Sequence, residues 1–159
     1  MADVFIGFGS NLGDRPGYLR QAMRHLNGPA LRLRACSSFR KTNPVGGPVQ
    51  PDYVNAVARF ESTISPRMLM DRLLTVEARF GRTRTFENAP RTLDLDLLLY
   101  GQVRVQTAHL TLPHPRMTSR SFVLEPLTEL VPLLNLSGQT PLEHLNKLRS
   151  CSDCATCLN

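Results

Sequence analysis

The sequence predicts an α+β fold of the ferredoxin-like class, a split βαβ sandwich whose single sheet is mostly antiparallel and carries helices on one face. Two observations predict this class. Segments with strand periodicity and segments with helix periodicity follow one another in the order β-α-β-β-α-β, which is the order of the split βαβ motif. The chain has 159 residues, about the size of one domain, and its 42% of apolar residues suffices for one core.

The first part of the chain contains two expected strands with a helix between them. Residues 3–11 form an apolar run that ends in Gly and Asn, which indicates a strand and a turn. In residues 13–28 apolar side chains recur at helical spacing, Asp14 lies near the N-cap, and Gly28 ends the segment. Residues 30–39 alternate apolar and basic side chains, which predicts a half-exposed strand.

The middle of the chain contains the second half of the motif. Residues 42–52 are rich in Pro and Gly, so we expect a long loop before a strand over 53–63. Residues 65–81 begin with Ser and Pro and end with Gly, which predicts a helix. An arginine-rich loop over 82–91 then leads to a leucine-rich strand over 92–100.

The last part of the chain is expected to hold smaller elements. Residues 101–107 predict a turn and a short strand, residues 112–127 a proline loop that becomes helical, and residues 141–149 a short helix. We expect one domain over 1–149 and a disordered tail over 150–159. The tail contains Cys151, Cys154 and Cys157, whose spacing has the form of a metal ligand set without a fourth ligand.

The basic residues are almost all arginines. The net charge is +6, and of the 19 basic residues all but Lys41 and Lys147 are arginines. Because the forked guanidinium fits phosphate and carboxylate oxygens, we expect an anionic partner, either a nucleic acid or a phosphorylated small molecule. A solvated, arginine-rich surface is the alternative. No apolar run approaches the about 20 residues of a membrane span, and no basic segment precedes the N-terminal apolar run, so a cytoplasmic protein without a membrane partner is expected.

Two aspartates interrupt the leucine-rich strand. Because side chains alternate along a strand, Asp94 and Asp96 point to the same face, which we expect to be the open face of a central strand. Adjacent carboxylates repel each other, and a cation relieves the repulsion. Mg2+ prefers one or two carboxylates together with phosphate oxygens, so the pair is a candidate site for two Mg2+ ions that clamp a polyphosphate.

Nearby arginines favour this interpretation over a salt-bridged surface pair, which is the ordinary meaning of two spaced aspartates. Acidic metal ligands beside basic phosphate ligands give the outline of a nucleotide site. The arginines that precede the pair are Arg79, Arg82, Arg84 and Arg91, and those that follow it are Arg116 and Arg120.

Other polar residues have both a functional and a structural interpretation. His114 lies between two prolines, and Glu77 ends a helix where it can pair with an arginine that follows. Tyr53 and Asn55 share one face of their strand and could stack on and hydrogen-bond a flat heterocycle, or form an ordinary cross-strand pair. The stretch GFGSNLGD lacks the ending of a phosphate loop, so it predicts a tight turn in which Asn11 supports a nearby loop.

Five segments together resemble one enzyme family. They are GFGSNLGD, SSFRKTNPVGGPVQPDYVNAV, EARFGRTR, APRTLDLDLLLYG and LTLPHPRMTSRSFVLEPL. In this combination and order they resemble 6-hydroxymethyl-7,8-dihydropterin pyrophosphokinase of the folate pathway. The resemblance implies transfer of an intact pyrophosphoryl group from ATP to the hydroxymethyl group of 6-hydroxymethyl-7,8-dihydropterin, with release of AMP.

The resemblance also implies roles for individual residues. Asp94 and Asp96 would hold two Mg2+ ions on the ATP phosphates, with Arg82 and Arg91 as catalytic phosphate ligands. The pterin pocket would comprise Thr42, Pro44, Val45, Tyr53, Asn55 and Phe122. The nucleotide site would comprise Glu77, Arg84, Thr111, His114, Arg116 and Arg120. ATP and the pterin would be the partners of a monomer that binds no nucleic acid.

One departure and two rival functions accompany this resemblance. Asn88 stands where many members carry Trp, so closure over ATP would rely on Phe86 or on the arginines. A palm-type nucleotidyltransferase shares the fold class and the paired aspartates, but would release pyrophosphate. An RNA-binding module would need exposed aromatic residues on the central strands, and only 6% of the chain is aromatic.

Overall fold

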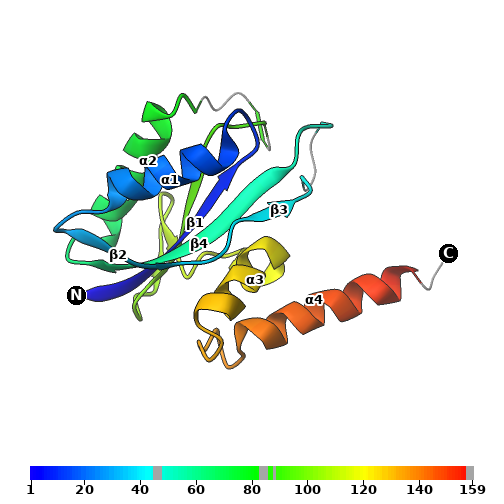
Figure 1. Cartoon of the computed structure of the whole chain (residues 1–159). Helices are drawn as coiled ribbons and strands as arrows, with labels where there is room; N and C mark the ends of the chain where they lie inside the picture. The colour runs from blue at the N-terminus through cyan, green and yellow to red at the C-terminus, as the bar shows by residue number, and fades with distance from the viewer. Residues whose placement is uncertain (45–47, 83–85, 88, 157–159) are drawn as a thin grey trace.

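The structure, a computed structural model of the chain, describes residues 1–44, 48–82, 86–87 and 89–156, without the side chains of residues 153–156. A five-stranded antiparallel sheet forms its centre (Figure 1). The strands run in the order β2-β4-β1-β5, and β3 pairs with the start of β4. Their bounds are β1 (Ala2–Ser10), β2 (Leu31–Cys36), β3 (Arg40–Thr42), β4 (Tyr53–Ser62) and β5 (Asp94–Tyr100).

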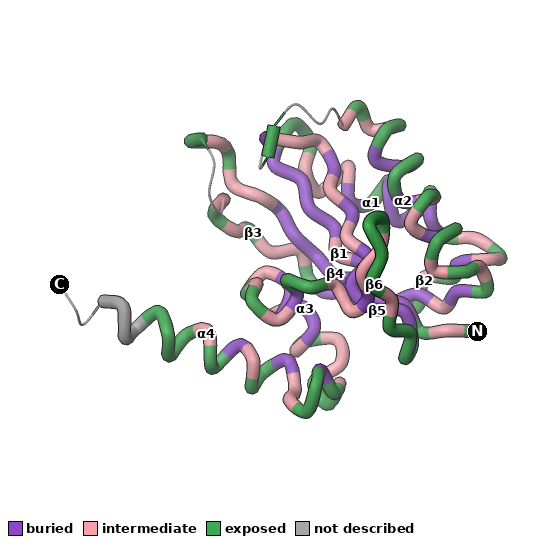
Figure 2. Tube along the Cα trace, turned by 180° about the vertical axis from the view of Figure 1, so that it is seen from behind, coloured by how far each residue is buried: buried purple, intermediate pink, exposed green. Residues whose placement is uncertain are grey.

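The helices α1 (Arg15–Leu26) and α2 (Pro66–Arg79) pack together over one face of the sheet. Asp14 and Ser65 cap them by accepting from the backbone N–H three residues later, at 3.1 and 3.2 Å, and each helix has a proline in its first turn. Figure 2 shows the buried residues along the strands and the inner sides of these helices. The fully buried residues of this core include Ile6, Leu19, Leu26, Phe60, Leu69, Leu73 and Leu93.

An irregularity in β5 places two consecutive leucines on the other face of the sheet. Ile6 of β1 pairs with Leu97 and Phe5 pairs with Leu99, so Leu98 is an extra residue in the ladder. Leu98 and Leu99 therefore both belong to the second hydrophobic cluster, together with Phe5. The bulge thus adds apolar side chains to the face of the sheet that carries the two aspartates, next to them along β5.

The helices α3 (Ser121–Leu130) and α4 (Pro141–Thr156) cover this second cluster. The 3-10 helix η1 (Met117–Ser119) leads into α3, and a small hairpin of β6 (Val105–Gln106) and β7 (Thr111–Leu112) follows β5. The buried apolar side chains that α3 and η1 contribute are Met117, Val123, Leu124 and Leu127.

The predicted ferredoxin-like class is confirmed, with two differences in detail. The face opposite α1 and α2 is open only in part, because α3 and α4 cover the portion around Leu98 and Leu99, which follows the aspartates along β5. The aspartate strand β5 is an edge strand rather than a central one, because β1 pairs with both β4 and β5. On the free edge of β5, the N–H of His114 donates to the carbonyl oxygen of Leu98 at 2.9 Å.

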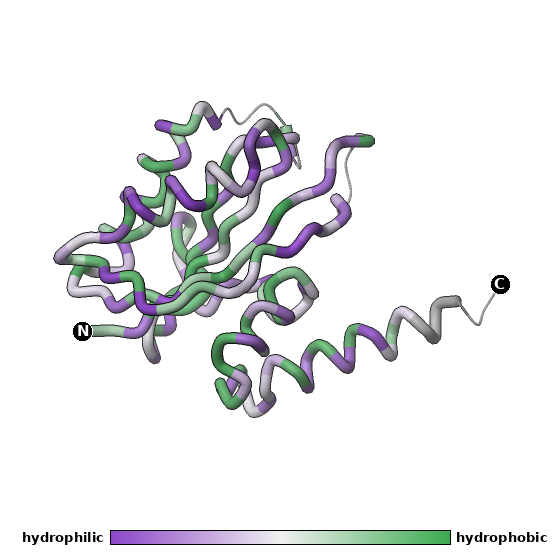
Figure 3. The backbone as a smooth tube through the Cα atoms, viewed as in Figure 1, coloured by the Kyte–Doolittle hydropathy of each residue, from purple (hydrophilic) through white to green (hydrophobic). Residues whose placement is uncertain are grey.

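The last helix extends further than the sequence predicts. The predicted helix ends at Arg149, whereas α4 continues as a helix to Thr156 and projects from the body of the molecule (Figures 1 and 3). Leu148 still packs against the second cluster. Beyond it, the hydroxyls of Ser150 and Ser152 donate to carbonyl oxygens one turn earlier, at 2.9 and 3.0 Å, a bond that forms within a helix without any tertiary contact.

That the three cysteines of the tail form part of a metal ligand set stays a prediction. Cys151 is exposed and is not in a disulfide, whereas the side chain of Cys154 and all of Cys157 lie outside the described residues. In the part of the chain that the structure describes, none of the helices has both the length and the apolarity that crossing a membrane requires.

Candidate active site

Asp94 and Asp96 lie side by side at the start of β5, beyond the region that α3 covers. Both side chains face the same hollow, as the alternation predicts, and they are 25% and 29% exposed. Leu95 and Leu97 point the other way, into the core below α1 and α2. The leucines therefore fix the strand, and the strand fixes the separation of the two carboxylates.

In the part of the chain that the structure describes, three arginines from three segments contact these carboxylates. Arg82, after α2, lies 2.6 Å from Asp94 Oδ1, and Arg91, before β5, lies 3.5 Å from the same oxygen. Arg120, at the start of α3, lies 3.4 Å from Asp96 Oδ2. These guanidinium groups are mostly buried, so they hold their forked N–H donors close to the carboxylates, and such donors fit carboxylate or phosphate oxygens.

Glu77 anchors Arg82 and β5 from the side of the sheet that α2 covers. It lies at the end of α2 and is 3% exposed. Its Oε1 accepts from the backbone N–H of Leu95 at 2.7 Å and from Nη1 of Arg82. A carboxylate this deeply buried is strongly unfavourable without such partners, so the arrangement holds the backbone between the two aspartates in place. The predicted pairing of Glu77 with a following arginine is thus found.

The surroundings of Asp96 disfavour its charge. The pKa of its carboxyl is raised to about 6, first by burial and then by the neighbouring charge of Asp94, while Arg120 opposes the shift. The fold thus makes the charged form of this carboxyl costly, and a bound cation would favour that form.

His114 completes the edge of the site as a neutral imidazole. The pKa of its imidazole is lowered to about 4, first by burial and then by the charges of Arg120 and Arg116. Its Nδ1 accepts from the N–H of Arg116 at 3.2 Å, so the proton is on Nε2, which lies 3.8 Å from Asp96 Oδ1. That distance is too long for a hydrogen bond, and His114 presents a donor towards the site rather than a charge.

A slot with a backbone floor lies beside the carboxylates. Gly9 of β1 pairs with Asn55 on one side and with Asp94 on the other, and a Cβ at Gly9 would lie only 2.8 Å from Asn55 Oδ1. Asn55 is oriented by donating to Thr42 Oγ1. Phe122 of α3 lines the same hollow. The glycine therefore leaves the backbone uncovered on a face that also carries an aromatic ring and an amide, which are the groups that recognise a flat heterocycle.

Two aromatic side chains connect this slot to the arginines. Arg91 Nε donates to the hydroxyl of Tyr53 at 3.1 Å, and the guanidinium lies 5.9 Å from the centroid of the Tyr53 ring. The guanidinium of Arg120 lies 5.4 Å from the centroid of Phe122. The residues predicted for a heterocycle and those predicted for phosphates thus adjoin in space.

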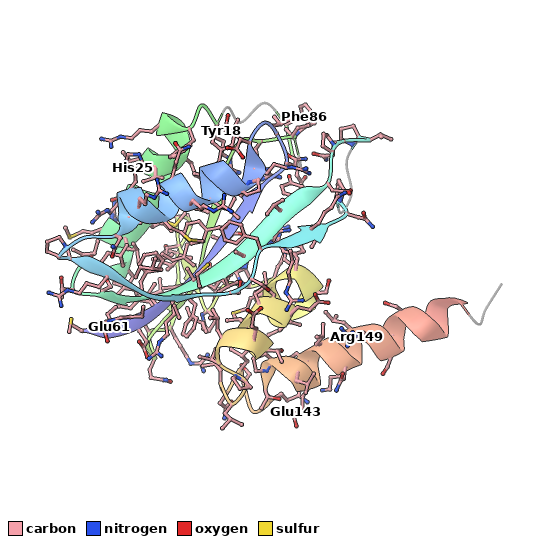
Figure 4. All side chains as sticks on the ribbon, viewed as in Figure 1. Tyr18, His25, Glu61, Phe86, Glu143 and Arg149 are labelled. Atoms are coloured by element: carbon pink, nitrogen blue, oxygen red, sulfur yellow. The ribbon has the colours of Figure 1, made fainter. Side chains whose placement is uncertain are left out.

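Some predicted residues lie apart from this centre. Thr111 is in β7, Arg116 is exposed beside η1, and Pro44 is half-buried after β3; in the described residues none of these side chains bonds to the aspartates or to the three arginines. Phe86 is 58% exposed at the end of the molecule where the loops before β4 and β5 meet (Figure 4). The predictions for Val45, Arg84 and Asn88 fall on residues outside the described ranges.

Two features of the site are absent from the candidates that the sequence yields. The slot depends on Gly9, and Gly7 sits next to it on the same face, where it pairs with Asp96. Their alternation with large apolar residues could have indicated a strand face without side chains. Asn11 is bonded to two loops rather than one, which requires the tertiary structure to be known.

The carboxylate pair fits Mg2+ as one part of a coordination shell. Within the described ranges, no group of three or more His, Cys, Asp or Glu side chains is placed to hold a metal ion. Mg2+ is commonly bound in this incomplete way, by one or two carboxylates, with substrate phosphates and water as the other ligands. A bound cation would also offset the burial and the repulsion that raise the pKa of Asp96.

Comparison with known proteins identifies the family. A sequence profile described as 7,8-dihydro-6-hydroxymethylpterin-pyrophosphokinase (HPPK) matches residues 5–132. The chain belongs to this family. The family that the five segments resemble is thereby confirmed, and the arginine and aspartate cluster lies within the matched residues.

Relatives named 2-amino-4-hydroxy-6-hydroxymethyldihydropteridine pyrophosphokinase match most of the chain. The protein of Haemophilus influenzae is 40% identical over 148 residues, which cover 92% of each chain. That of Methylorubrum extorquens is 37% identical over 149 residues, 93% of this chain and 94% of the relative. That of Bacillus subtilis is 40% identical over 128 residues, 80% of this chain and 77% of the relative.

A solved structure agrees with the fold. The crystal structure of Plasmodium falciparum HPPK-DHPS matches with a TM-score of 0.72 at 12% identity. The match covers 100% of this HPPK chain but 46% of the other one, so the chain spans just under half of that protein. At this identity the likeness concerns the fold alone.

We predict that Asp96→Asn stabilises the metal-free enzyme at neutral pH. The folded pKa of Asp96 is about 6 and its usual value is 3.8, so the free energy of unfolding falls as pH rises between these values. Asn removes the charge and should add about 1–2 kcal/mol to the free energy of unfolding at pH 7.5. This gain is smaller than the full pKa shift corresponds to, because water screens a partly exposed carboxylate.

Urea unfolding with a chelator at pH 7.5 and at pH 4 measures this gain. At pH 4 the wild-type carboxyl is protonated when folded, so the gain should nearly disappear. Asp3→Asn is the control, because Asp3 pairs with Arg59 on the surface at 2.7 Å and should show no gain. An equal gain for Asp96→Asn at both pH values would contradict the electrostatic cause.

Proposed function

We propose that this enzyme transfers an intact pyrophosphoryl group from ATP to the hydroxymethyl group of 6-hydroxymethyl-7,8-dihydropterin, a step of folate biosynthesis. The observation that supports it best is the adjacency of the two halves of the site. A carboxylate pair with three arginines lies directly beside a slot that suits a flat heterocycle. The relatives named above are called pyrophosphokinases of this pterin.

The polyphosphate half of the site would hold two Mg2+ ions on Asp94 and Asp96. When bound, the ions would supply positive charge to the phosphate oxygens and lower the pKa of the attacking hydroxyl. The same space is faced by Arg82, Arg91 and Arg120. When the polyphosphate binds, these guanidinium groups would exchange their carboxylate partners for phosphate oxygens. The nucleotide would extend towards His114, whose Nε2–H is a neutral donor at pH 7.

The pterin half of the site would use the slot. The ring would lie over the backbone at Gly9, against Phe122, with Tyr53 on its far side. Asn55 would recognise the amide-like edge of the pterin, because Thr42 already holds its carboxamide in one orientation. Pro44 and Val45 would close the pocket from the loop after β3.

The proposed reaction does not require a protein side chain as general base. The pterin hydroxyl oxygen attacks the β-phosphorus, the bond between that phosphorus and the bridging oxygen to the α-phosphate breaks, and AMP leaves with the electron pair. The hydroxyl proton passes to solvent. The chain's residues contribute position and charge: the slot aims the hydroxyl, and Arg82 and Arg91 receive the charge that develops on the phosphates.

The wider proposal is a monomeric cytoplasmic enzyme that binds no nucleic acid. Two rival functions are less well supported. A palm-type nucleotidyltransferase would attack the α-phosphorus and release pyrophosphate, and family membership argues against it. An RNA-binding module would present aromatic side chains and positive charge, whereas this face carries Asp94 and Asp96.

Turnover assays test this proposal through its products. With ATP, Mg2+ and the hydroxymethyl-dihydropterin, AMP and diphosphorylated pterin should form in equal amounts. Asp96→Ala should lower kcat at least about a hundredfold, while pterin affinity measured without nucleotide changes little. Asp3→Asn, at the opposite end of β1, is the control and should retain kcat. Formation of pyrophosphate, or an Asp96→Ala enzyme with normal turnover, would contradict the proposal.

We predict a selective loss of pterin binding in Gly9→Ala. The added methyl group would lie 2.8 Å from Asn55 Oδ1 and would force that side chain off its bond to Thr42. Pterin affinity should fall about tenfold or more, the loss expected when a buried polar contact is disrupted. Affinity for a non-hydrolysable ATP analogue should change by less than about threefold.

Gly28→Ala is the matched control for this measurement by calorimetry. Gly28 lies at the far end of the molecule, and its Cβ would meet only the flexible end of Arg72, at 4.0 Å. Both affinities should stay at wild-type values in this variant. Unchanged pterin affinity in Gly9→Ala would exclude the slot as the pterin pocket.

A further inference from the structure

A second hollow lies on the same face of the sheet as the active site, towards the other end of the strands. Its floor contains Arg59, Phe5 and Leu99, which are neighbours across β4, β1 and β5. Gly9 of the active site is four residues further along β1, a separation of about 13 Å. Apolar side chains of α3 pack on the part of the sheet between the two hollows. The second hollow is therefore a separate place on the molecule.

Two hydrogen-bonded turns form the walls of this hollow. In the turn after α3, the N–H of Leu134 donates to the carbonyl oxygen of Val131 at 3.0 Å. In the turn after β5, which carries Gln102, the N–H of Val103 donates to the carbonyl oxygen of Tyr100 at 2.9 Å. These bonds shape both walls in the absence of a ligand, so binding here would cost little ordering of the chain.

The lining of the hollow is mainly apolar. Phe5 and Leu99 are buried in its floor, whereas Leu133 on its rim is 88% exposed. Concave apolar surface of this kind favours a ligand with an apolar body. The volume of the hollow is about 370 Å³. Since a cavity of about 150 Å³ can hold benzene, this hollow has room for a ring and a substituent.

The polar part of the hollow is the guanidinium group of Arg59. Its Nε and Nη2 donate to the two carboxylate oxygens of Asp3, at 3.1 and 2.7 Å. Among the residues that the structure describes, none accepts a hydrogen bond from Nη1 of Arg59, and none bonds to the side-chain amide of Gln102. The hollow therefore offers a ligand hydrogen-bond donors beside an apolar floor.

The charges around Arg59 favour an uncharged acceptor over an anion. The pKa of Arg59 is raised, first by its bond to Asp3, and the charge of Glu61 also raises it. Glu61 is the ladder partner of Asp3 and lies at the end of the molecule opposite Phe86 (Figure 4). An added carboxylate would meet two carboxylates that already compensate the guanidinium. A carbonyl oxygen can accept from Nη1 without that repulsion.

We propose that this hollow is a second ligand site, which takes a small uncharged molecule with an apolar ring and a carbonyl oxygen. The ring would lie on Phe5 and Leu99, and the carbonyl oxygen would accept from Nη1 of Arg59. The exposed side chain of Leu133 would cover the ring from the rim. The proposed reaction uses none of these residues, so the site is additional to those for ATP and the pterin.

Titration with acetanilide, an uncharged aromatic amide, tests this site by nuclear magnetic resonance. We expect saturable shifts of the backbone amides of Phe5, Leu99 and Gln102, a Kd of about 1 mM, and no shift at Asn55. Benzoate has the same ring and a negative charge, and it should bind at least about fivefold more weakly. Absence of saturable shifts around the hollow, or tighter binding of benzoate, would overturn the inference.

Arg59→Met tests the polar contact. Met keeps a long apolar side chain but has no N–H donor, so the Kd for acetanilide should rise about fivefold. Arg34→Met is the matched control, because Arg34 forms a similar surface pair with Glu61 and does not line the hollow. This control should bind acetanilide like the wild type. Equal affinities in the two variants would overturn the inference.

A second pair of variants tests the apolar contact at the rim. Leu133→Ala should raise the Kd for acetanilide about threefold, because less apolar surface would be buried. Leu142→Ala is the control, since Leu142 is an exposed leucine of α4 that does not line the hollow. Equal affinities in these two variants would contradict the predicted position of the ring.

Competition separates this site from the active site. A saturating Mg2+–nucleotide analogue together with the hydroxymethyl-dihydropterin should leave the Kd for acetanilide within about twofold of its value without them. Displacement of acetanilide by these ligands would place it in the pterin slot and would overturn the inference. A protein that binds acetanilide in the second hollow but forms no AMP would contradict the proposed function alone.

Discussion

Everything in this site depends on keeping two carboxylates charged and adjacent on the edge strand of a small sheet. A strand spaces Asp94 and Asp96 on one face, but their mutual repulsion and partial burial oppose this arrangement, as the raised pKa of Asp96 shows. The fold opposes the repulsion from two sides. Leu93, Leu95 and Leu97 hold β5 in the core below α1 and α2, and Glu77 binds the backbone N–H between the two aspartates.

The same constraint explains why the site has arginines from three segments rather than a closed metal cage. Arg82, Arg91 and Arg120 partly neutralise the pair, yet each is attached to a loop or a helix start and can turn to phosphate oxygens. Carboxylates without a full ligand set bind a metal well only when a substrate supplies the remaining oxygens. In the proposed function this arrangement would favour joint binding of metal and polyphosphate, and the slot at Gly9 would place the acceptor beside them.

Local patterns in the sequence predict the fold class and the central chemistry, but not the features that arise from contacts between distant segments. The alternation of side chains along a strand predicts that Asp94 and Asp96 share one face. The capping residues Asp14 and Ser65 predict where two helices begin. No local pattern could show that β5 is an edge strand, since pairing is decided by competition among all the strands. The bonds from Asn11 to two loops and the burial of Glu77 depend on residues many positions apart. The bulge that puts Leu98 and Leu99 on one face depends on the register with β1.

The metal role of Asp94 and Asp96 is best tested by counting bound Mn2+ ions by electron paramagnetic resonance, with Mn2+ in place of Mg2+ and a saturating non-hydrolysable ATP analogue. We expect two ions per wild-type molecule. In the double variant Asp94→Asn, Asp96→Asn we expect fewer than two ions and an affinity for the metal–analogue complex at least about a hundredfold lower. Two ions bound to the double variant with unchanged affinity would contradict the assignment of these aspartates as the metal ligands.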